Sequence, residues 1–73
     1  MRVSIDYMLV NVNAIGRRAI YRIQDVSKIY NTAKEAGKDY NLRMCKYSYV
    51  DDDDNIIKTY NNAKLDGFGR RIN

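Results

Sequence analysis

The sequence predicts a single small α+β domain of order β-β-α-β-β, in which one helix packs across one face of an antiparallel sheet. Runs that alternate between apolar and polar residues lie in both halves of the chain, and a segment with a helical period separates them. The chain has 73 residues, enough for one domain, residues 1–73, with a thin core. Its one cysteine allows no intrachain disulfide, so packing alone must hold the fold.

Two strands are expected in the first third, over residues 2–12 and 17–23, with a turn between them. The first has apolar side chains at every second position: Val3, Ile5, Tyr7 and Leu9. The second has a face predicted to meet the core, formed by Ala19, Tyr21 and Ile23. Its other face is amphipathic, with Arg18, Ile20 and Arg22.

The helix is expected over residues 25–36. Apolar residues recur there at helical spacing: Val26, Ile29, Tyr30, Ala33 and Ala36. Asp25 is a suitable N-cap, and Gly37 suits the end of a helix. Ile29 is therefore predicted to be a core residue, and Ile29→Asp to unfold the domain.

Two further strands are expected over residues 42–50 and 56–61, joined by the turn-forming run DDDDN. The strand 42–50 has no wholly apolar face; the interpretation favours Leu42, Met44 and Val50 toward the helix. Tyr47 and Tyr49 then lie on the open face of the sheet. The tail, residues 63–73, is either loose or docks through Leu65 and Phe68.

The sequence offers little for catalysis. It has no histidine, and Glu35 is its one glutamate. Cys45 is a nucleophile without a base nearby in the sequence. Asp51, Asp53 and Asn55 match the opening of a calcium loop, but Ile56 stands where glycine is required and Asn62 where glutamate is required. We therefore expect no enzyme, no metal and no cofactor. Residues 51–55 are interpreted as a solvated turn or, alternatively, as an acidic knob that meets a basic partner.

A net charge of +4 permits binding to nucleic acid or to an acidic protein surface. No apolar run is long enough to span a membrane and the N-terminus lacks an apolar signal region, so a cytoplasmic protein is expected. An outer sheet face that gathers arginine and tyrosine would suit phosphates and bases, or a protein hot spot. The alternative is a face that only confers solubility. The candidate partner-binding residues are Arg18, Arg22, Arg43, Tyr47, Tyr49, Arg70 and Arg71.

In size, element order and composition the chain resembles small bacteriophage proteins of the early host-takeover or anti-defence type. That resemblance implies a compact domain that binds a host protein stoichiometrically and inhibits it, in the host cytoplasm. Two alternatives remain: a small RNA- or DNA-binding protein, whose affinity would fall with salt, and a sponge for a nucleotide signal at oligomer interfaces. A homo-oligomer is also expected, because the core is thin and an edge strand can pair with a second copy.

Overall fold

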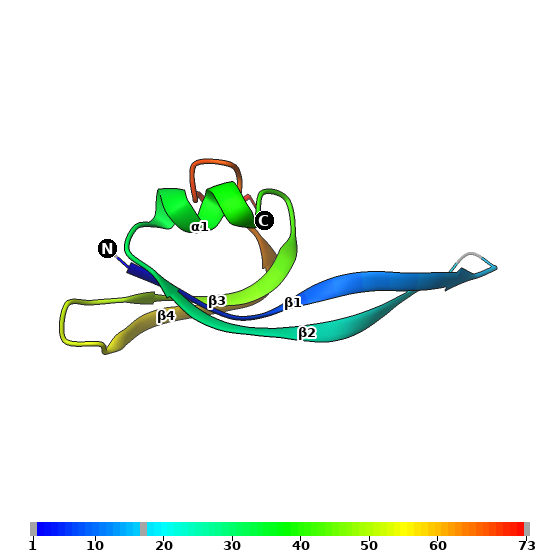
Figure 1. Ribbon diagram of the computed structural model, residues 1–73, viewed down its shortest axis with the longest axis horizontal. Coiled ribbons are helices and arrows are strands. Elements are labelled where there is room, and N and C mark those ends of the chain that lie inside the picture. The colour runs from blue at the N-terminus through cyan, green and yellow to red at the C-terminus, as the bar shows by residue number, and fades with distance from the viewer. Residues whose placement is uncertain (1, 17, 73) are drawn as a thin grey trace.

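The computed structural model describes residues 2–16 and 18–72, with the side chains of residues 13–15 left aside. Four antiparallel strands form one sheet in the order β2-β1-β3-β4, and a single described helix packs on one face of it (Figure 1). The elements are β1 (Arg2–Ile15), β2 (Arg18–Tyr30), α1 (Ala33–Asp39), β3 (Met44–Val50) and β4 (Ile56–Lys64). The predicted α+β class and β-β-α-β-β order are confirmed.

The core lies between α1 and the sheet. Residues opposite each other in an antiparallel pair point to the same face, so the pairs Val3–Tyr49 and Ile5–Tyr47 identify the core face. Every element, and the segment after β4, contributes to the core cluster: Val3, Ile5, Tyr30, Ala36, Cys45, Tyr47, Ala63 and Leu65. Burial of each large apolar side chain stabilises the fold by roughly 1.5–3 kcal/mol.

The predicted helix over residues 25–36 is wrong in its first half, because residues 25–30 belong to β2. Ser27 has a φ of +48°, and the β1–β2 register shifts there. This bulge interrupts the two-residue alternation of the strand, so that Val26, Ile29 and Tyr30 acquire a helix-like spacing. Tyr30 is buried as predicted, whereas Ile29 is 53% exposed and is not a core residue.

Helix α1 begins later and is shorter than predicted. Its N-cap is Thr32, whose side chain accepts a hydrogen bond from the Glu35 backbone N–H at 3.2 Å. Asp25, the predicted cap, instead accepts a hydrogen bond from the Ser27 hydroxyl at 2.8 Å. Gly37 lies buried inside the helix rather than beyond its end.

The β1–β2 hairpin is longer than predicted on both strands. β1 continues through the expected turn at residues 11–16, with a register shift between Asn11 and Asn13. The strands meet at Gly16, whose φ of +61° suits a tight hairpin turn. Arg17, the predicted start of the second strand, lies outside the described residues. Pairing with β2 supplies the backbone hydrogen bonds that make this asparagine-containing stretch a strand.

The faces of β3 are the reverse of those predicted. Cys45 and Tyr47 are fully buried on the core face, whereas Leu42 precedes the strand and is exposed. Val50, also predicted to face the helix, is buried at the end of the strand but is not part of the core cluster. Lys46 and Ser48, the alternate residues, pair with Tyr7 and Ser4 on the other face. The two parities of this strand have similar apolar content, so the hydrophobic pattern alone does not determine its orientation.

The C-terminal segment is ordered and docked. Ala63 and Lys64 complete β4, and Leu65 is fully buried and forms bridges with Asn41 and Arg71. Of the two alternatives left open for the tail, loose or docked, the structure has the docked one, with Leu65 as the buried contact. Phe68 does not share this role, because it is 64% exposed.

Candidate functional site

The most prominent feature outside the core is a projecting two-stranded arm. Pairing between β1 and β3 ends at Met8–Cys45, and beyond that point β1 pairs with β2 alone. The arm, defined as residues 9–16 and 18–23, extends from the body along the long axis of the molecule (Figure 1). The molecule is accordingly elongated, with extents of 46 × 19 × 17 Å.

The arm leaves large apolar side chains in solvent. Tyr21 is 54% exposed and Ile23 63% exposed, and Val12 and Ile20 are exposed as well. The predicted sharing of one face by Ala19, Tyr21 and Ile23 follows from strand alternation, but that face is not buried against a core. A two-stranded ribbon is marginally stable by itself, and contiguous exposed apolar groups mark interaction sites.

The arm is also cationic. Residues 9–23 include three arginines and no aspartate or glutamate. Arg18 and Arg22 are exposed, and Arg22 donates a long hydrogen bond of 3.4 Å to the side chain of Gln24. An apolar ribbon with guanidinium groups and no carboxylate suits a partner surface that is apolar and anionic.

A groove of about 390 Å³ lies where the arm leaves the body. Leu9 and Tyr21 of the arm line one part of it, and Leu42 and Arg43 of the loop before β3 line another. This groove brings the predicted binding residue Arg43 next to the arm, a neighbourhood that sequence spacing does not indicate.

The predicted outer-face platform does not form as expected, because Tyr47 and Tyr49 lie on the core face. Tyr47 is fully buried, and burial raises its pKa. Its hydroxyl is buried with no hydrogen-bond partner among the described residues. Tyr49 is half-buried, and burial raises its pKa too.

An aromatic cluster forms around Tyr47 instead. The ring of Tyr60 stacks on Tyr47 with centroids 5.2 Å apart, and Tyr49 meets both rings edge-on at 5.8 and 6.0 Å. The Arg71 guanidinium lies 4.8 Å from the Tyr60 centroid and the Lys58 ammonium 5.8 Å from it. The cluster thus joins three of the predicted binding residues, Tyr47, Tyr49 and Arg71.

Arg70 is held within the C-terminal segment. The Asp66 carboxylate accepts hydrogen bonds of 2.9 Å from the backbone N–H groups of Phe68 and Arg70, and one of 3.0 Å from Arg70 Nε. The pKa of the Asp66 carboxyl is lowered, chiefly by the hydrogen bond from the backbone N–H of Arg70. Asp66 therefore organises this turn, and the Arg70 side chain lies against it rather than with the other arginines.

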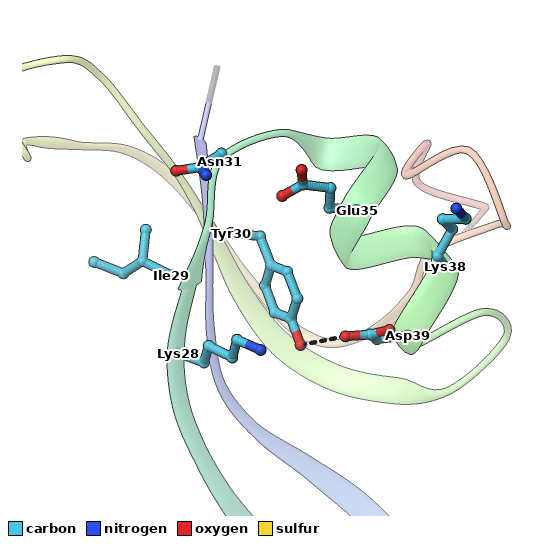
Figure 2. Close-up of a pocket in the computed structure, with 7 residues that line it drawn as sticks. All are labelled: Lys28, Ile29, Tyr30, Asn31, Glu35, Lys38 and Asp39. Carbon is cyan, nitrogen blue, oxygen red and sulfur yellow. Dashed lines mark hydrogen bonds between the residues drawn. The ribbon is translucent and has the colours of Figure 1, made fainter.

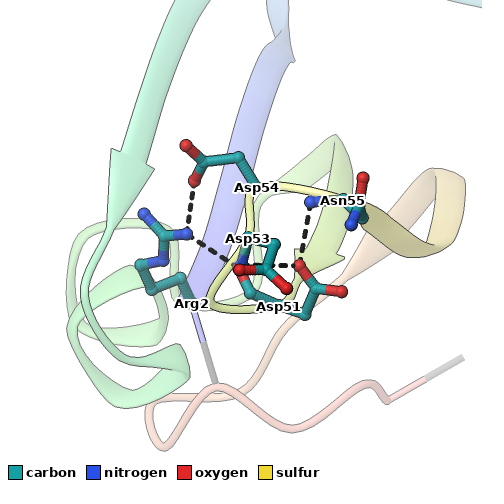
Figure 3. Close-up of polar contacts among 5 residues, drawn as sticks. All are labelled: Arg2, Asp51, Asp53, Asp54 and Asn55. Carbon is teal, nitrogen blue, oxygen red and sulfur yellow. Dashed lines mark hydrogen bonds and ion pairs between the residues drawn. The ribbon is translucent and has the colours of Figure 1, made fainter.

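The acidic turn is built on Asp51 and Arg2 (Figure 3). Asp51 Oδ1 accepts hydrogen bonds of 2.9 Å from the backbone N–H groups of Asp53 and Asn55. Arg2 donates to the Asp51 carbonyl oxygen at 2.7 Å and forms an ion pair with Asp54. Within the described residues, no three histidine, cysteine or acidic side chains converge as a metal site would require.

A second hollow of about 360 Å³ lies between the end of β2 and α1 (Figure 2). Tyr30 donates a hydrogen bond of 2.9 Å to Asp39, and Lys28 Nζ lies 4.7 Å from the centroid of the Tyr30 ring. Burial, more than this bond, raises the pKa of Tyr30. Lys38 and Glu35 complete a lining of mixed charge, which selects no single class of ion.

Comparison of the chain with protein-family models, with curated proteins and with solved structures gives no match. Across the described ranges, no helix has the length and apolarity of a transmembrane span. The arm is the candidate binding feature that the alternation of the sequence did not indicate. The signal for it was the stretch of residues 7–24 without an acidic residue, longer than a hairpin in a small core requires.

Proposed function

We propose that the chain is a non-enzymatic binding protein whose arm engages a partner protein, which the chain inhibits or modulates. The observation that supports this proposal is the projection of exposed Tyr21 and Ile23 from a body whose core is already covered by α1. Tyr21 and Ile23 share one face of the ribbon, and Arg18 and Arg22 share the other. Exposed aromatic groups and arginine are residue types enriched in binding hot spots. The resemblance to phage host-takeover proteins suggests a host protein or defence complex in the host cytoplasm.

Affinity purification from a lysate of the source host tests this proposal. The immobilised chain is expected to retain one protein at stoichiometric level, and Tyr21→Ser/Ile23→Ser to lose it. The control is Phe68→Ser/Ile72→Ser, which removes equally exposed apolar groups from the C-terminal segment and should retain the partner. Equal capture by both double variants, or no stoichiometric partner for the unaltered chain, would refute the proposal.

Nucleic-acid binding is the second candidate, and the cationic, acid-free arm favours it. A two-stranded β-ribbon fits the DNA major groove, and arginine neutralises phosphates. Oligonucleotide mobility shifts at low salt should then fall steeply with added salt, with a shallower slope for Arg18→Gln/Arg22→Gln. A chain that shifts no duplex or single strand at low salt is not a nucleic-acid-binding protein.

A further inference from the structure

We infer that the arm of one molecule docks on the opposite, acidic end of a second copy, so that the chain associates head to tail. The acidic end is defined as residues 51–57, the β3–β4 turn and the start of β4. In Figure 1 the arm and this turn lie at the two ends of the long axis. One molecule therefore presents two different surfaces that cannot meet each other within a single chain.

The acidic end matches the arm in charge. Residues 51–54 are four consecutive aspartates, whereas the arm has two arginines, Arg18 and Arg22, and no acid. Arg2 pairs with Asp54 (Figure 3). Asp52 and Asp53 are exposed, and no ion pair joins either carboxylate to a described residue. These two carboxylates are accordingly available to guanidinium groups of another molecule.

The two ends also match in apolar character. Ile56 and Ile57, separated from the aspartates by Asn55 alone, are 66% and 53% exposed. They present β-branched side chains beside negative charge, as the arm presents Tyr21 and Ile23 beside positive charge. Contact between the ends would remove apolar groups of both from water, which favours association.

The backbone permits the same contact. β4 is an edge strand of the sheet. The C-terminal segment covers this edge at its far end, near Lys64, where the Ile72 N–H donates to the Lys64 carbonyl at 3.0 Å. β2 is the other edge strand, and its arm portion lies beyond the body. An arm strand can therefore extend the sheet of the next molecule alongside the start of β4, as strands add to exposed edges.

Such a contact joins unlike surfaces, so it forms open chains or a closed ring rather than a twofold dimer. The inference goes beyond the proposed function, because it concerns the purified chain alone. A foreign partner that uses the arm would compete with it.

Light scattering on the purified chain, with two charge-removing variants, tests the inference. The arm variant is Arg18→Gln/Arg22→Gln, and the turn variant is Asp52→Asn/Asp53→Asn. At low salt the unaltered chain should exceed its 8.5 kDa monomer mass as concentration rises, and 1 M salt should reverse this. Each variant alone should associate at least about tenfold more weakly.

Mixing the two variants is decisive, because the turn variant keeps an intact arm and the arm variant keeps an intact turn. An equimolar mixture should form a 1:1 pair that grows no further. Ile56→Ser/Ile57→Ser, with charges intact, should weaken association as the turn variant does. The inference is overturned if the unaltered chain stays monomeric at ~1 mM and low salt. It is equally overturned if variants that fold by circular dichroism still associate alone, or fail to pair when mixed.

Discussion

Gly37 of α1 and Gly69 of the C-terminal segment are in direct backbone contact. A Cβ atom at Gly37 would overlap the backbone nitrogen of Gly69 and lie 2.5 Å from the Asp66 carbonyl oxygen. Gly69 has a φ of +84°, and a Cβ atom there would overlap the Ala33 carbonyl group. The helix and the C-terminal segment can pack this closely only because both positions lack a side chain.

Gly37→Ala is expected to destabilise the fold by about 2 kcal/mol or more, because the methyl group has only backbone atoms against it. Gly67→Ala is the matched control, since its added Cβ would lie 3.5 Å from the Asn41 side chain, an ordinary contact. Urea unfolding of the two variants compares these costs. Equal midpoints would show that helix and segment are not packed in this way.

Ile5 and Ile29 occupy neighbouring strands but differ in burial. Ile5 is fully buried and Ile29 is 53% exposed. Ile5→Ala should cost about 2–5 kcal/mol, while Ile29→Ala should change stability by roughly 0.5 kcal/mol or less. Ile29→Asp should also stay folded, contrary to the prediction from the helical spacing. Thermal unfolding of the three variants measures these changes in stability. If Ile29→Asp failed to fold, the helix predicted over residues 25–36 would be favoured over β2.

Replacement by phenylalanine should change stability differently at Tyr30 and at Tyr47, because only one of the two hydroxyl groups has a hydrogen-bond partner among the described residues. Tyr30 donates to Asp39 at 2.9 Å, so Tyr30→Phe should lose about 1 kcal/mol. The Tyr47 hydroxyl has no partner among the described residues, so Tyr47→Phe should be neutral or more stable by up to about 1 kcal/mol. Denaturant midpoints distinguish them, and a clear loss in Tyr47→Phe would reveal a hydrogen bond at that hydroxyl.

Alkaline pH should weaken the fold partly through Cys45. Burial raises the pKa of its thiol from 9.0 to about 11, so the folded state retains a proton that the unfolded chain releases. The stabilising contribution is therefore complete below about pH 9 and is lost as pH rises toward 11. Urea unfolding of Cys45→Ala should therefore show a smaller fall in unfolding free energy between about pH 9 and 11 than that of the unaltered chain. If the unfolding free energy of both proteins changed with pH at the same slope, the Cys45 thiol would be exposed to water.

Local alternation was enough to predict the fold class and the element order. It failed at Ser27, because a bulge changes the spacing of apolar residues, and in β3, because Cys45 and Tyr47 alternate with residues of similar polarity. Tertiary contacts, rather than the local pattern, decide such cases.

The arm was not predictable for a different reason. An exposed ribbon alternates as a buried hairpin does, so the pattern of Ala19, Tyr21 and Ile23 does not reveal whether a third strand covers it. For the same reason, the candidate binding residues do not form the single surface that was predicted. Arg18 and Arg22 lie on the arm, whereas Tyr47 and Tyr49 lie in or beside the core.

Removal of the arm tests most directly whether it is the binding surface. In a shortened chain, a two-residue turn between Met8 and Gln24 replaces residues 9–23, while the β1–β3 pairing and the core cluster remain. This chain should unfold cooperatively near the temperature of the full chain, yet capture no stoichiometric partner from the host lysate. A folded, shortened chain that still captures the same partner would place binding on the body and contradict the proposed role of the arm.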